Sequence, residues 1–233
     1  SDNTPWFFNG IRIQIHPTRH LKELRLMDHG CEVINGLSEL YVAVAHAAPA
    51  KRAAYREPFH ALLDQVLALG RNEDGLLYTA IQPAAGTHSA GLSDTWGYDY
   101  DAFYTTYLLD GTEAYRDAVR HVLGRLKGKY VGAPWADKSA DGYADSIEGA
   151  INLYNREPVP SAADWIDSQT RLMWGIQKPD GVIEAWHGDG NFARTTLMYC
   201  FWKTQGLHVE PWRPDVRVGA VREGDTLLVS LTA

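Results

Sequence analysis

Hydrophobic and polar positions follow two different periods along this chain. Near the N-terminus, Ile11, Ile13 and Ile15 occupy every second position, which predicts a short strand. From Cys31 onward, apolar residues recur every three to four positions, which is the period of a helix with one buried face. Residues 216–233 return to alternation around a Glu-Gly-Asp turn, so we expect a β-hairpin there.

Seven segments have the helical period, and Gly, Pro and Asp-Gly breaks separate them. The connections after the first, third and fifth segments are short, and those before the third, fifth and seventh are long. Helices joined in this way form antiparallel hairpins, so the long loops share one end, over the N-termini of the odd-numbered helices. The fourth and sixth helices have more charged faces, so we expect the odd helices inside and the even helices outside. The predicted helices cover residues 31–47, 52–70, 100–110, 113–130, 143–157, 162–177 and 191–206.

This hairpin rhythm and two stretches of sequence support a resemblance to a known group of enzymes. The stretches GYDYDAFYTTYLLDGTEAYRDAVRHVL and DGNFARTTLMYCFWKTQG resemble the six-hairpin, (α/α)-toroid carbohydrate-active enzymes, which include glycoside hydrolases, unsaturated-glucuronyl hydrolases and polysaccharide lyases. The resemblance implies an all-α fold, an (α/α) hairpin toroid over residues 31–206. Residues 1–30 would form a strand and loop, and residues 207–233 a C-terminal β-hairpin.

The number of helices departs from that group, because a closed toroid needs more helices than the seven predicted here. The chain is therefore interpreted as a partial toroid, as the C-terminal part of a longer enzyme, or as an arc that another chain or segment completes. The resemblance favours a periplasmic or secreted location over the cytoplasm.

Composition narrows the classes of function. The net charge is −7, from 22 Lys and Arg against 29 Asp and Glu, and no basic stripe suggests a nucleic-acid partner. No apolar run is long enough to predict a membrane span. The two cysteines, Cys31 and Cys200, are interpreted as buried thiols. No HExxH, CxxC, GxSxG, P-loop or GxGxxG motif occurs, so we expect no metal and no cofactor.

The loop before the seventh helix reads WHGDGN and is the first candidate for one wall of a site. It combines the aromatic ring of Trp186, the imidazole of His187 and the carboxylate of Asp189. Asp189 or Asn191 is also suited to cap the helix that follows, which is the simpler reading for Asn191.

Arg194 lies one turn into that helix. Together with the helix N-terminus, it would suit a carboxylate ligand. The simpler alternative for Arg194 is an ion pair with Asp189 or Asp180.

The third helix begins near a second cluster. Asp99 and Asp101 flank Tyr100, and neighbouring positions at a helix start point in different directions, so we expect one carboxylate to face the cavity. An N-cap role is the simpler interpretation of Asp99. Tyr98 and Tyr100 are suited to stack on sugars or to move protons.

The fifth helix supplies a third cluster. Asp145 and Glu148 are three residues apart, so they share one face near the helix N-terminus. Two carboxylates in this arrangement can raise the pKa of one of them and create a general acid. The alternative is a capping box on the rim of the helix.

Aromatic residues in polar loops are a further signal, because they often form the walls of sugar sites. The loop aromatics are Trp96, Tyr98, Trp135, Tyr143 and Trp186, and His88 lies in the long loop before the third helix. Other aromatic residues are expected in the core: Trp165, Trp174, Trp202 and Tyr107.

Three functions remain open on the sequence alone. A glycosidase acting on an oligo- or polysaccharide, with or without uronate residues, would use two carboxylates from Asp99, Asp101, Asp145 and Glu148, with Asp189 in reserve.

A lyase would instead use His187 and Tyr100 for β-elimination, with Asn191 and Arg194 neutralising a uronate carboxylate. A sugar-binding domain without chemistry would have aromatic loops but no buried carboxylate pair. The remaining candidates for substrate contact are Trp96, Tyr98, His88, Tyr143 and Trp186.

Overall fold

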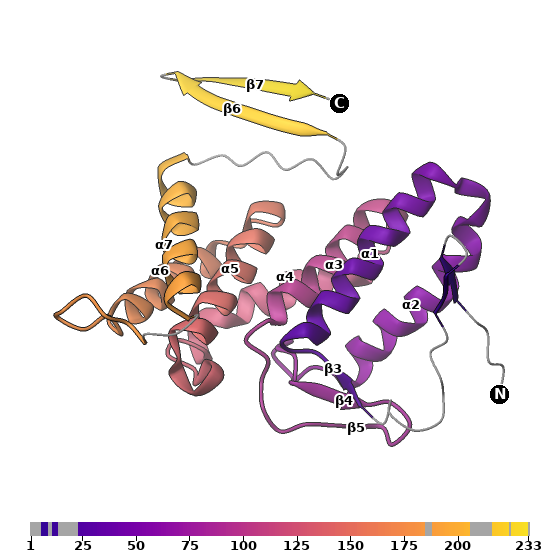
Figure 1. Cartoon of the computed structure of the whole chain (residues 1–233), viewed down its shortest axis with the longest axis horizontal. Helices are drawn as coiled ribbons and strands as arrows, with labels where there is room; N and C mark the ends of the chain where they lie inside the picture. Colours follow the sequence, from indigo (N-terminus) through magenta and orange to yellow (C-terminus); the bar gives the residue numbers. More distant parts are fainter. Residues whose placement is uncertain are drawn as a thin grey trace.

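The computed structural model describes residues 6–8, 11–13, 23–184, 188–205, 216–223 and 225–232, and this part of the chain is mostly helical (Figure 1). The helices are α1 (His29–Ala47), α2 (Arg52–Leu69), α3 (Trp96–Asp110), α4 (Glu113–Lys129), α5 (Ala140–Arg156), α6 (Pro160–Trp174) and α7 (Gly188–Gln205). The strands are β1 (Trp6–Phe8), β2 (Ile11–Ile13), β3 (Leu24–Arg25), β4 (Ala80–Gln82), β5 (Thr87–His88), β6 (Arg217–Glu223) and β7 (Thr226–Thr232). Short 3₁₀ turns precede α2 and α5. The prediction of a helical chain with an N-terminal strand and a C-terminal hairpin is confirmed for these residues.

Helices α1, α3, α5 and α7 form a row in which each packs against the next (Figure 1). Neighbours in this row run in the same direction. Asn191 of α7 contacts Asp141 of α5 near both N-termini, and Trp202 contacts Tyr154 further along the same two helices. The N-termini of α5 and α7 therefore lie at one end, as the lengths of the loops predict.

The even-numbered helices form a second layer. Helix α4 packs on α6, and ion pairs join α4 to the start of α6 and to the turn before it. Lys127 Nζ lies 2.5 Å from the Asp164 carboxylate, and Arg120 Nε lies 2.7 Å from the buried Glu157 carboxylate. The charged faces of α4 thus lie on the outside, as expected of an outer helix.

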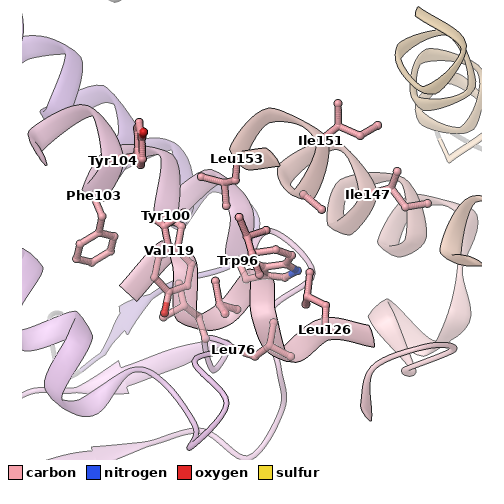
Figure 2. Packing of buried hydrophobic residues seen from close by; sticks show 14 of the residues in the cluster. Leu76, Trp96, Tyr100, Phe103, Tyr104, Val119, Leu126, Ile147, Ile151 and Leu153 are labelled. Carbon is pink, nitrogen blue, oxygen red and sulfur yellow. The ribbon is translucent and has the colours of Figure 1, made fainter. Parts of the chain in front are cut away.

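The core lies between the two layers and is rich in aromatic rings (Figure 2). Trp96 is fully buried, and its ring lies edge-on to that of Trp165, with 6.4 Å between the ring centres. Trp135 and Tyr143 are also buried. Of the described loop aromatics expected at a site, these three are therefore core residues, because their rings fill the space between the helix layers.

Two residues that the sequence predicts to be buried are exposed at the surface. The side chain of Trp174 is 37% exposed, although its indole N–H donates to the Thr196 hydroxyl at 3.0 Å. Cys31 is buried as predicted, but Cys200 on α7 is exposed.

Several helix starts also differ from the predictions. Helices α3, α5 and α7 each begin three or four residues earlier than expected, because their glycine-containing first turns are helical despite the low helix propensity of glycine. The N-cap of α6 is Val159, because Pro160 takes the first helical position, and α6 thus begins two residues before the predicted start at residue 162.

Short strands were not predicted before α1, where β3 lies, or in the long stretch before α3, where β4 and β5 lie. β3, β4 and β5 form an antiparallel sheet in which Ile81 pairs with both Leu24 and His88. At the C-terminus, β6 and β7 pair from Arg217–Thr232 to Glu223–Thr226, as the alternation predicts.

A buried carboxylate joins the first three helices and α4 at the end opposite the long loops. Asp110 at the end of α3 accepts a hydrogen bond from the Tyr41 hydroxyl at 3.0 Å and lies 2.6 Å from His60 Nε2. Arg52 also donates to it, and the second ring nitrogen of His60 lies 3.1 Å from the Tyr115 hydroxyl. Asp110 is thus a polar anchor for this end of the bundle.

None of the helices in the described ranges combines the length and the apolar character that crossing a membrane requires.

Candidate functional site

The N-terminal parts of α3, α5 and α7 meet because α3 and α5 approach unusually closely. Gly97 and Gly149 face each other across this contact, and a Cβ added at Gly149 would lie 2.7 Å from the Gly97 Cα. Any larger side chain at either position would separate the helices. The close approach brings the Tyr98 side chain within hydrogen-bonding distance of the carboxylates of α5.

Glu148 lies at the centre of this contact. Its carboxylate is buried and accepts three hydrogen bonds: from the Tyr98 hydroxyl at 3.0 Å, from Arg194 Nε at 2.7 Å and from the Thr195 hydroxyl at 2.5 Å. The donors come from α3 on one side and α7 on the other. Glu148 therefore fixes the side chains of both neighbouring helices. We refer to Tyr98, Asp145, Glu148, Arg194 and Thr195 as the Asp145 cluster.

Asp145 lies one turn nearer the N-terminus of α5 and is less enclosed. Its side chain is 17% exposed, and its carboxylate lies 3.2 Å from the Tyr98 hydroxyl and 3.6 Å from an Arg194 Nη atom. Burial, followed by the charges of Asp141, Asp94 and Glu148, raises the pKa of Asp145 to about 7. The carboxyl group can therefore carry a proton near neutral pH.

Asp145 and Glu148 share one face of α5, as their spacing predicts. The alternative of a capping box is wrong, because α5 begins at Ala140 and its N-cap is Ser139. The Ser139 hydroxyl accepts the Gly142 N–H at 3.0 Å. Both carboxylates lie beyond the first turn, where capping groups are not needed.

Asp94 was missed by the sequence reasoning. It directly precedes Thr95, the N-cap of α3, and it is buried. Burial and the charges of Asp28 and Asp141 raise the pKa of Asp94 to about 6, although the backbone N–H groups of Asp94 and Thr95 oppose this shift. Its Oδ1 atom has no hydrogen-bond partner among the described residues. An aspartate just before a helix start was the available signal.

The loop before α7 is bound to the start of α5. The Glu184 carboxylate accepts the Ala140 N–H, and the Asn191 amide donates to Asp141. The Asp189 carboxylate accepts the Glu184 N–H at 2.7 Å. Asn191 and Asp189 thus connect the loop to its surroundings. Helix α7 begins at Gly188, so the expected cap positions lie inside its first turn.

Arg194 was expected either to bind an anion or to pair with Asp189 or Asp180. Its guanidinium group pairs with Glu148 and, at longer distance, with Asp145. The hydrogen bond to Glu148, more than any other interaction, raises the pKa of Arg194. Arg194 therefore belongs to the same cluster as the two carboxylates of α5.

The structure separates the three candidates of the second cluster from this site. Tyr100 is buried, and its hydroxyl donates to the Gly75 carbonyl at 2.5 Å. Asp101 lies 3.3 Å from Arg156 Nε at the far end of α5. Tyr98 is the residue from this stretch that reaches the cluster.

Asp99 is not the N-cap of α3, because Thr95 holds that position. It is fully buried, and neither carboxyl oxygen has a hydrogen-bond partner in the described part of the chain. Burial raises the pKa of Asp99 well above its usual range, because a charged carboxylate is disfavoured away from water.

The remaining substrate-contact candidates occupy different places. His88 stacks on Tyr78, with ring centres 3.7 Å apart, and its Nδ1 lies 2.7 Å from the Ser89 carbonyl. Trp96 and Tyr143 belong to the core, so their rings offer no face to a ligand. Trp186 and His187 lie outside the described residues.

The arrangement provides one carboxyl group that is protonated near neutral pH, an arginine, a tyrosine hydroxyl and further carboxylates around it. Such a set can donate a proton and hold hydroxyl groups. Among the residues with described positions, no group of three or more His, Cys, Asp or Glu side chains is arranged to hold a metal ion. Comparisons with protein-family models, with curated proteins and with solved structures find no match to this chain.

Proposed function

We propose that this protein hydrolyses glycosidic bonds of an oligo- or polysaccharide, with Asp145 as the general acid. A glycosidase needs a carboxylic acid that is still protonated at its working pH, beside a second carboxylate that is ionised. The observation that carries the proposal is the environment of Asp145, which raises its pKa to about 7 while leaving the side chain partly exposed.

The other carboxylates have different roles in this proposal. Glu148 is buried under three hydrogen-bond donors, so it anchors Tyr98 and Arg194 and does not exchange protons with a substrate. Asp94 and Asp141 interact electrostatically with Asp145. Asp94 is as buried as Glu148, so Asp141 is the candidate for the second carboxylate, which would act as base or nucleophile.

The same contacts favour hydrolysis over the other two functions. β-Elimination by Tyr100 would require a hydroxyl that reaches the substrate, whereas this one is buried and donates to Gly75. A purely sugar-binding domain would have aromatic loops without a buried carboxylate pair. Here Trp96 is in the core, while the Tyr98 hydroxyl lies within hydrogen-bonding distance of both the buried Glu148 and the partly exposed Asp145.

We also propose that the row α1, α3, α5 and α7 is an arc of an (α/α) toroid. Adjacent helices of the row run in parallel, and α4 and α6 cover it from outside. The Asp145 cluster lies toward the N-terminal ends of the inner helices, where the long loops gather.

The test is a panel of neutral and uronate-containing oligosaccharides, assayed for new reducing ends and for ultraviolet absorbance in the same well. Hydrolysis yields reducing ends without absorbance, and Asp145→Asn should lower the rate by about 10²–10⁴-fold, the usual contribution of a general acid. Asp164→Asn is the control, because it removes an exposed carboxylate that pairs with Lys127.

Two results would refute this assignment. Rising absorbance would indicate an unsaturated product and therefore a lyase. Full activity in Asp145→Asn would remove Asp145 from the reaction.

A further inference from the structure

The Asp145 cluster contains two carboxylates and one arginine. Asp94 and Asp141 also interact electrostatically with Asp145. The guanidinium group of Arg194 pairs with Glu148 at 2.7 Å and lies 3.6 Å from Asp145, so its charge is already matched inside the cluster. A negatively charged ligand would therefore meet no unmatched positive charge among these five side chains.

Arg194 is also already engaged by a buried partner. Its Nε donates to Glu148 at 2.7 Å, and the Glu148 side chain is only 6% exposed. A ligand carboxylate that took this edge of the guanidinium would leave Glu148 buried without its ionic partner, which is costly. The hydrogen bonds from Tyr98 and Thr195 hold Glu148 in place.

Neutral hydroxyl groups face no such penalty. The remaining N–H groups of Arg194 can donate to a sugar oxygen, and the carboxylates of Asp145 and Asp141 can accept from sugar hydroxyls.

We propose that the Arg194–Glu148 pair makes this site select an uncharged, hydroxyl-rich sugar over a uronate. The inference rests on the proposed glycosidase function and narrows its substrate class. Glu148 acts as the internal counter-ion that withdraws Arg194 from carboxylate recognition.

The experiment compares chemically matched ligands. Oligosaccharides of glucuronate, galacturonate and mannuronate are each tested beside the same oligosaccharide after reduction of its carboxyl groups. Dissociation constants are measured by calorimetry at low salt on Asp145→Asn, which suppresses turnover, and on the unaltered protein at short times. We expect at least one reduced member to bind about tenfold or more tightly than its uronate counterpart, because Arg194 is already paired with Glu148 and a ligand carboxylate would have to break that pair.

A variant then tests the part played by Glu148. Glu148→Gln keeps the size of the side chain but removes its charge, so Arg194 becomes available to an anion. The preference for the neutral member should shrink or reverse, whereas Asp164→Asn, which removes an exposed charge, should leave it unchanged. Circular dichroism checks that Glu148→Gln is folded. If it is not folded, the comparison of uronate and reduced ligands on the unaltered protein still tests the inference.

Tighter binding of the uronate member in the unaltered protein overturns the inference, as does the absence of binding by every reduced member. A folded Glu148→Gln with an unchanged preference also overturns it. Hydrolysis of a uronate oligosaccharide would refute the inference while leaving the glycosidase function in place. Binding of a neutral sugar without cleavage would refute the glycosidase function and leave the selectivity standing.

Discussion

Gly97 of α3 and Gly149 of α5 are in backbone contact, and this contact sets the distance between the two helices that carry Tyr98 and Asp145. A Cβ at Gly149 would lie 2.7 Å from the Gly97 Cα, so Gly149→Ala forces the helices apart. We expect a loss of about 1–3 kcal/mol in the free energy of unfolding, the usual cost of overpacking. Chemical denaturation measures this loss.

The matched control is Gly124→Ala. Gly124 lies in α4, and a Cβ there would meet no atom within 4 Å. This substitution should leave stability unchanged or raise it by up to about 1 kcal/mol, because alanine favours the helix. Equal effects at the two positions would mean that the α3–α5 contact is not tight.

Asp145→Asn should change how stability depends on pH. Burial raises the pKa of Asp145 to about 7 in the folded protein, against an ordinary value of 3.8. Between these values the folded state keeps a proton that the unfolded state has lost, so the wild type loses stability as pH rises from about 4 to about 7. The variant lacks this group. The difference in free energy of unfolding between variant and wild type should therefore be about 2–4 kcal/mol more favourable to the variant at pH 8 than at pH 4.

Denaturation curves at pH 4 and pH 8 on both proteins measure the difference. Asp164→Asn, at an exposed position, should show the same offset from wild type at both values. An offset for Asp145→Asn that does not change with pH would mean that Asp145 titrates like an exposed aspartate.

Asp99 and Asp101 should respond in opposite ways to conversion to asparagine. Burial raises the pKa of Asp99, and its carboxyl oxygens have no hydrogen-bond partner among the described residues, so Asp99→Asn should be at least as stable as wild type. Asp101→Asn weakens the ion pair with Arg156 and should cost about 1–3 kcal/mol. Thermal unfolding of the two variants measures this difference. If Asp99 had a structural ionic role, Asp99→Asn would be the less stable of the two.

Removing the Asp110 carboxylate should strongly destabilise the end of the bundle that lies opposite the site. Burial alone would raise its pKa, but hydrogen bonds from Arg52, His60 and Tyr41 hold the pKa of Asp110 below its usual range. Asp110→Ala removes the shared acceptor of the buried Tyr41 hydroxyl, the largely buried His60 ring and the half-exposed Arg52, and should cost about 3–5 kcal/mol. Because the folded pKa is lowered, this contribution is present above the unfolded value and is lost as pH falls below about 4.

The control for Asp110 is Glu73→Ala, which removes an exposed partner of Lys129. A surface pair of this kind contributes about 0–1 kcal/mol. If both alanine variants unfolded at the same denaturant concentration, the Asp110 network would not be the anchor that its contacts indicate.

The sequence predicted the helices and their hairpin order because these depend on local period and loop length. The pairing of Asp145 with Glu148 was likewise predictable, since three residues along a helix always share a face. Their partners were harder to identify. Tyr98 and Thr195 reach Glu148 from other helices, and only the packing of α3, α5 and α7 determines those contacts.

Aromatic residues gave the least reliable signal. Trp96 follows a polar loop, which is a position typical of a ligand-binding aromatic residue. It is nevertheless the first residue of α3, and its ring is buried in the core. The sequence pattern did not identify Asp94, two residues earlier, because a single aspartate before a helix usually serves only as a cap. Its burial depends on how α3 sits among its neighbours, which local pattern does not determine.

The role of Asp145 as general acid depends on a proton that its carboxyl group holds near neutral pH. The most direct measurement is a carbon-13 NMR titration of the aspartate side-chain carboxyl groups, with Asp145→Asn used to assign the signal. We predict that the Asp145 signal titrates with a midpoint near 7. A midpoint near the ordinary value of 3.8 would contradict the role of Asp145 as general acid.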